Sequence, residues 1–163
     1  MLESLVERMN RTGVAYAHEL RGCSASEIST LQALYGVVPP VYREYLERMG
    51  HSSGRLFTHD HVAVTLEYVL EMTNELRLEL ATDAPDLPPP GSLVIAGRLG
   101  EQFEFIELAV TTGDAPVYYF NTYDLKVRQS HPSVLAWLEC WCTAAEDAIG
   151  RGYFHKYPQG TTP

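Results

Sequence analysis

The stretch SLVIAGRLGEQFEFIELAVTTGDAPVYYFN, at residues 92–121, decides the class of fold. It contains three segments rich in β-branched and aromatic residues, which favour β-strands: Ser92–Ala96, Gln102–Ala109 and Pro116–Asn121. Gly97–Glu101 separates the first two segments and is typical of a hairpin loop. Strands joined by such short connections pair antiparallel, so these residues predict an antiparallel meander.

The segments on either side of this stretch predict helices, because their apolar residues recur at three- and four-residue spacing. Ser24-Ala25-Ser26-Glu27 is a capping box, and Pro40 suits a first helical turn. A further short strand is expected at Leu125–Arg128. Helices are expected over Leu2–Asn10, from Ser24 to a stop at Gly36, and over Pro40–Met49, Leu66–Ala81 and Pro132–Ile149.

The order of these elements predicts the class. Helices come first, strands follow, and one helix closes the chain, without the strand–helix–strand alternation of a parallel sheet. We therefore expect a single α+β domain, in which helices pack on a mainly antiparallel sheet of about four to six strands. Its parts are expected to be an N-terminal helix and connection at 1–20, the main body at 21–150 and a tail at 151–163.

Composition and charge indicate the class of protein, the partners it avoids and its expected compartment. The chain has 163 residues, of which 45% are hydrophobic and 20% charged, as in one globular domain. Its formal net charge of −9 argues against nucleic acid and anionic membranes as partners, because their phosphates would be repelled. Glu3 and Glu7 interrupt any apolar run at the N-terminus, and three cysteines make no disulfide framework. We therefore expect a cytoplasmic protein with reduced thiols.

Several short motifs, mostly helix caps and core positions, follow one another between about residues 24 and 148. Ser26–Leu31 has an acidic residue, Ile and Leu at the spacing of one helix. Tyr35–Leu46 has a Gly that interrupts the helix, followed by a second helix that begins at Pro and contains Tyr. In these motifs the chain resembles the SUKH superfamily, which includes fungal cell-wall assembly regulators and bacterial immunity proteins. Val38 stands where that family commonly has Leu, and Met49-Gly50 where it often has Asn-Gly. Further matches lie at Leu93–Gly97, Gln102–Phe105, Pro116–Phe120 and Ser133–Glu139.

The resemblance implies a non-catalytic α+β domain that works by binding another protein. In the bacterial branch the partner is a toxin, which the immunity protein neutralises inside the producing cell. We therefore expect an immunity protein with no catalytic residue and no cofactor, whose partner is a toxin with a basic surface. A regulatory or scaffold protein that binds an endogenous partner is the alternative that the fungal relatives imply.

The acidic excess is concentrated in residues 66–107, which carry nine acidic and two basic side chains. Glu67, Glu71, Glu75 and Glu79 are spaced by four, so on a helix they form one ladder opposite the apolar side. Such a face would attract a basic protein surface and orient it. A solvated helix face shows the same pattern, and that interpretation stays open.

The residues expected to contact the partner extend this ladder. Tyr68 is expected near the ladder and Leu78 within it, and Phe57 is a loop candidate for an apolar anchor. The full predicted set is Glu67, Tyr68, Glu71, Glu75, Leu78, Glu79, Asp83, Asp86, Glu101 and Glu104.

A metal-dependent enzyme is a further alternative, built on the loop HSSGRLFTHDH from His51 to His61. His51, His59, Asp60 and His61 offer atoms that ligate zinc, but no Cys or further His stands at a recognised ligand spacing. We therefore expect no metal ligand. The sequence also lacks a Gly-x-Ser-x-Gly elbow, a phosphate-binding loop and a dinucleotide fingerprint.

Overall fold

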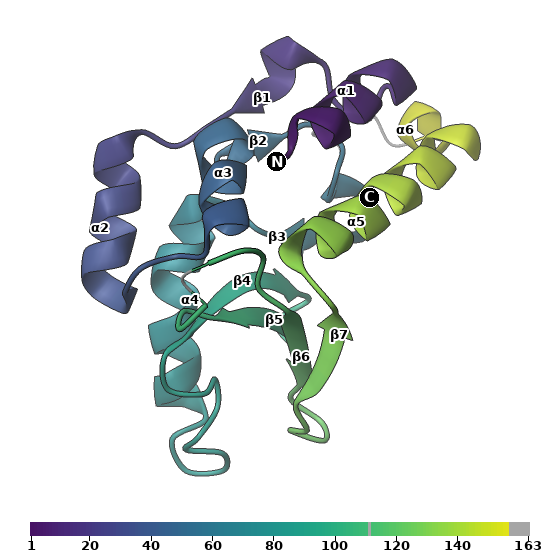
Figure 1. The fold of residues 1–163 in the computed structure, drawn as a ribbon. Helices are drawn as coiled ribbons and strands as arrows, with labels where there is room; N and C mark the ends of the chain where they lie inside the picture. The colour runs from purple at the N-terminus through teal and green to yellow at the C-terminus, as the bar shows by residue number, and fades with distance from the viewer. Residues whose placement is uncertain (111, 157–163) are drawn as a thin grey trace.

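The computed structural model describes residues 1–110 and 112–156, which form a five-stranded antiparallel sheet with helices on both faces (Figure 1). The strand order β3-β4-β5-β6-β7 follows the chain, and β1 and β2 form a small second sheet. The predicted α+β class is confirmed. The elements are α1 (Glu3–Thr12), η1 (Ala17–Glu19), β1 (Leu20–Arg21), α2 (Ala25–Tyr35), α3 (Pro40–Met49), β2 (Ser52–Ser53), η2 (Thr58–Asp60), β3 (Val62–Ala63), α4 (Leu66–Glu79), β4 (Ser92–Arg98), β5 (Gln102–Glu107), β6 (Val117–Asn121), β7 (Arg128–His131), α5 (Val134–Gly150) and α6 (Tyr153–Lys156).

The helix ends follow from local chemistry. The amide of Glu27 donates to Ser24 Oγ (3.3 Å), and the amide of Ser24 donates to the Glu27 carboxylate (2.7 Å), which completes the predicted capping box of α2. Pro40 begins α3 as predicted, and Gly13 ends α1 in the left-handed conformation (φ 76°).

β4 lies inside the sheet and is buried on both faces. Its residues Ser92–Gly97 are all buried, and its neighbours β3 and β5 pair with it antiparallel. On one face of the sheet, Leu76 of α4 and Leu80, which caps that helix, pack on Phe103, Phe105 and other apolar side chains of the sheet. This first core therefore occupies the α4 side of the sheet.

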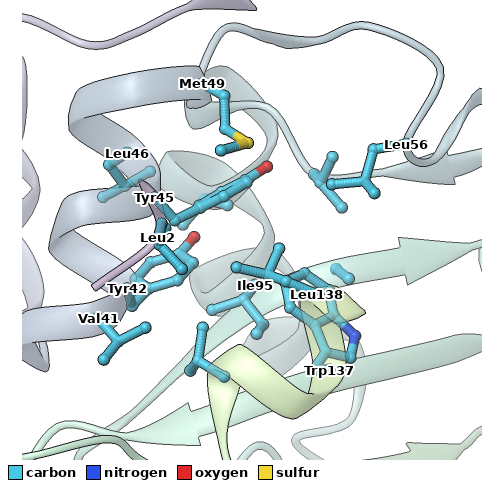
Figure 2. Packing of buried hydrophobic residues seen from close by; sticks show 14 of the residues in the cluster. Leu2, Val41, Tyr42, Tyr45, Leu46, Met49, Leu56, Ile95, Trp137 and Leu138 are labelled. Carbon is cyan, nitrogen blue, oxygen red and sulfur yellow. The ribbon is translucent and has the colours of Figure 1, made fainter. Parts of the chain in front are cut away.

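The larger core lies on the opposite side of the sheet, under α3 and α5 (Figure 2). The fully buried Trp137 of α5 lies at its centre, with ring centroids 5.2 Å from Phe57 and 6.4 Å from Tyr45. Phe57 is 2% exposed, so its prediction as an exposed loop anchor is wrong. Aromatic rings from three separate segments meet here, which ties α3, the η2 loop and α5 together.

Two predicted segments differ from the structure. β7 spans Arg128–His131, not Leu125–Arg128, because Asn121 accepts the amides of Tyr123 and Asp124 and holds the preceding residues in a turn. The predicted tail at 151–163 contains the short helix α6 at Tyr153–Lys156, and its residues 157–163 lie outside the described part of the chain.

Candidate functional site

Two adjoining cavities lie on the α5 side of the five-stranded sheet. Their volumes are about 660 and 120 Å³, and Asp60, Glu104 and Trp141 line both of them. The larger cavity follows α5 as far as α6, where Arg151 and Lys156 line it. Because the two cavities share three lining residues, they lie side by side, and we call them together the Glu104 pocket.

Strand alternation places Glu104 in this pocket. Its neighbours Phe103 and Phe105 point into the core under α4, so the Glu104 side chain points to the α5 side. The side chain is 15% exposed. The indole N–H of Trp137 donates to Glu104 Oε2 (2.7 Å), and the hydroxyl of Ser130 donates to Oε1 (3.2 Å).

Burial raises the pKa of the Glu104 carboxyl group, because desolvation disfavours its charged form. Hydrogen bonds from Trp137, Ser130 and Trp141 act against this rise without cancelling it. The nearest basic nitrogen is His131 Nδ1, 3.8 Å from Oε1, and burial lowers the pKa of His131. Within the described residues, no Arg or Lys forms an ion pair with Glu104.

The remaining acidic groups of the pocket have arginine partners. Arg98 Nη2 lies 2.7 Å from Asp60 Oδ1, and Arg151 Nη2 lies 2.7 Å from Asp147 Oδ2. Glu104 is thus the carboxylate of the pocket whose charge is not balanced by a guanidinium group.

Ser130, His131 and Glu104 are adjacent but do not form a nucleophilic triad. His131 Nδ1 lies 3.1 Å from Ser130 Oγ, and the same nitrogen faces Glu104 at 3.8 Å. In a triad the acid orients the imidazole through the nitrogen opposite the one that takes the serine proton. This arrangement therefore lacks the geometry of a serine nucleophile activated by a histidine.

The Glu104→Gln substitution is expected to stabilise the protein at neutral pH, by the order of 1 kcal/mol or about 2–4 °C in Tm. Because the pKa of Glu104 is raised in the folded protein, its contribution to stability is fully present below the pKa of the unfolded chain, about 4. That contribution is lost as pH rises through the folded-state pKa. The gain should therefore be present at pH 7 and vanish near about pH 4, as measured by thermal unfolding across pH. A destabilised variant at pH 7 would contradict the assigned burial of the charge.

The predicted acidic ladder lies on the exposed side of α4 and in the connection after it. The apolar positions opposite it, Val69, Leu76 and Leu80 among them, are buried. Leu78 lies among the acidic residues and is 79% exposed. The exposed members, which we call the α4 acidic face, are Glu71, Glu75, Leu78, Glu79, Asp83 and Asp86.

Four other members of the predicted set lie apart from this face. Glu67 is exposed, but its Oε1 lies 2.9 Å from His51 Nδ1. Tyr68 packs against the backbone of Gly97, where an added Cβ would lie 1.7 Å from the tyrosine oxygen. Glu101 stands in the β4–β5 turn. Glu104 lies in the pocket on the opposite side of the sheet, so its assignment to the acidic face is wrong.

The His51–His61 loop does not gather its histidines. His51 lies between the carboxylates of Glu27 (3.0 Å) and Glu67 (2.9 Å), whereas His59 lines the Glu104 pocket and His61 is exposed. Across residues 1–110 and 112–156, no three His, Cys, Asp or Glu side chains are placed to hold one metal ion. The geometry of this loop therefore does not bring its histidines together around one ion.

The sequence did not predict a role for the pocket residues His131 and Trp141, or for Ser130, which donates to Glu104. The signal that pointed to a buried acid was the run Phe103-Glu104-Phe105 beside the apolar segment Leu93–Gly97 of β4. Because alternate residues of a strand point to opposite faces, an acid between two core phenylalanines faces the other side of the sheet.

Comparisons with known proteins add no relative. Neither a protein-family model nor a curated protein matches this chain. Within the residues that the structure describes, no helix has the length and hydropathy needed to traverse a lipid bilayer. The SUKH resemblance therefore stays a prediction from the sequence motifs.

Proposed function

We propose that this chain is a non-catalytic protein-binding module, an immunity protein that neutralises a toxin through the α4 acidic face. The observation that carries this proposal is the unbalanced charge of that face. Within the described residues, none of its five carboxylates forms an ion pair with a basic side chain of the chain itself. A partner with a basic surface would supply the missing charge.

The basic residue of α4 does not neutralise this acidic face. Arg77 is the one basic residue of α4, and its guanidinium donates to the carbonyl oxygens of Pro89 (3.3 Å) and Ser92 (3.4 Å). Glu71, Glu75 and Glu79 therefore repel one another at i,i+4 spacing, each pair by about 0.2–0.5 kcal/mol. Binding of Lys or Arg side chains from a partner would relieve this repulsion.

Leu78 gives the face an apolar contact. Charge alone mainly raises the association rate and selects the partner, and affinity needs a desolvated anchor. A leucine that is 79% exposed between Glu75 and Glu79 can be covered by a partner while the carboxylates form the polar rim.

Reversal of two charges on this face is expected to slow binding of the partner. The test co-expresses the chain with the product of the neighbouring gene and measures association rates at several salt concentrations. The Glu71→Lys, Glu75→Lys variant should bind about 10- to 100-fold more slowly at low salt, because steering is lost. The wild-type rate should fall steeply as salt rises.

The matched control is the Glu7→Lys, Glu139→Lys variant, which makes the same change in net charge at exposed sites away from α4. Its association rate should stay close to that of the wild type. Equal slowing of both variants, or tight binding that ignores salt and both pairs of substitutions, would contradict a role of the α4 acidic face. Absence of any complex with the neighbouring product would contradict the immunity function and favour an endogenous partner.

A further inference from the structure

We propose that the Glu104 pocket binds a small organic cation, a primary ammonium group on an apolar chain that ends in a carboxylate. This site lies on the opposite side of the sheet from the α4 acidic face and does not depend on the proposed function. Its evidence is the charge at one end of the pocket, the aromatic and apolar wall, and the basic groups at the other end.

The Glu104 end of the pocket lacks a cation. The carboxylate is 15% exposed, accepts hydrogen bonds from Trp137 and Ser130, and has no Arg or Lys partner among the described residues. The acidic neighbours Asp60 and Asp147 are balanced by arginines at 2.7 Å. An ammonium group bound here would therefore contact one unbalanced carboxylate, that of Glu104, and would donate charge-assisted hydrogen bonds to it.

The wall beside Glu104 suits the methylenes attached to an ammonium group. Trp141 lines both cavities and is half-buried, so part of its indole faces the pocket. The indole offers apolar surface that the methylenes of a ligand can cover. Ala144 and Ala148 continue the same stripe of α5 at helical spacing, and their small side chains leave room for an alkyl chain.

The far end of the pocket is basic. Arg151 and Lys156 line it, and both side chains are exposed. Arg151 pairs with Asp147, so Lys156, which has no ion pair within the described residues, is the cation left for a ligand carboxylate. At the helical rise, Arg151 lies about 15 Å along α5 from Trp141. The pocket therefore suits an elongated molecule with a cation at one end and an anion at the other. The volume of about 660 Å³ is in the range of small-molecule sites.

The test uses three matched probes: 6-aminohexanoate, hexylamine and hexanoate. Binding is followed by titration calorimetry and by tryptophan fluorescence, because the only two tryptophans, Trp137 and Trp141, both neighbour Glu104. We expect 6-aminohexanoate to bind most tightly, hexylamine more weakly and hexanoate not measurably. A peptide that ends in Gly-Gly-Lys, with a free carboxylate, distinguishes a C-terminal lysine from a free ω-amino acid, and binding of either supports the site.

Two variants separate the ends of the pocket. Glu104→Gln should weaken both amines at least about tenfold, since it removes the charge but keeps an acceptor for Trp137. Lys156→Gln should leave hexylamine unchanged and remove the advantage of 6-aminohexanoate. Thermal unfolding at neutral pH checks that Glu104→Gln is folded. Equal binding of hexanoate and hexylamine, absence of binding by every probe, or unchanged binding by a folded Glu104→Gln protein would overturn the proposal.

Discussion

The Trp137→Ala variant is expected to lose about 3–5 kcal/mol of unfolding free energy relative to the wild type. Trp137 is 0% exposed and packs on Phe57 and Tyr45, so truncation leaves a large cavity where α3, α5 and the η2 loop meet. It also removes the N–H that Glu104 Oε2 accepts, which leaves a buried carboxylate with fewer donors. Urea unfolding measures the loss.

Leu78→Ala is the control for this prediction. Leu78 is large and apolar but 79% exposed, so its truncation should change stability by less than about 0.5 kcal/mol. Similar effects of the two substitutions would contradict the central position of Trp137 in the core.

The Gly22→Ala variant is expected to lose about 1–3 kcal/mol, or more where the backbone cannot move. A Cβ at this position would lie 1.8 Å from the carbonyl oxygen of Glu47 and 2.5 Å from its carbonyl carbon. Both are backbone atoms of α3, so relief requires β1 to separate from that helix. The separation would also strain the bond from the Cys23 amide to the Leu46 oxygen (2.8 Å).

Gly150→Ala is the matched control. No heavy atom lies within 4 Å of a Cβ added at Gly150, and this residue is the last of α5. Alanine is the better helix former, so the variant should be unchanged or gain up to about 1 kcal/mol. Thermal and urea unfolding of both variants check the pair, and a Gly22→Ala protein as stable as the wild type would refute the close approach of β1 to α3.

Local patterns predicted the helices and central strands well. The α3 helix begins and ends at the predicted residues, because Pro40 and Gly50 act on the backbone next to them. β7 was misplaced, and β1, β2 and β3 were not foreseen. Those strands are two to four residues long, and pairing with distant partners, such as Val62 with Arg98, creates them where local propensity is weak.

The α4 acidic face and the Glu104 pocket also differ in how far the sequence predicts them. The exposure of Glu71, Glu75 and Glu79 follows from their spacing on one amphipathic helix, so it could be predicted. The Glu104 pocket could not, because its residues come from β5, the end of β7, the η2 loop and α5, which are remote in the chain. Glu104 was consequently grouped with the ladder by charge alone.

By itself the sequence determined the α+β class, the caps of α2 and α3, and the acidic side of α4. Each depends on residues within a few positions of one another, whose steric and hydrogen-bonding preferences act before the chain folds. Only the tertiary structure decided which side of the sheet Glu104 occupies, what surrounds its carboxylate and where the histidines of the His51–His61 loop lie. Burial and pairing of charges depend on contacts between distant segments, which local preferences do not specify.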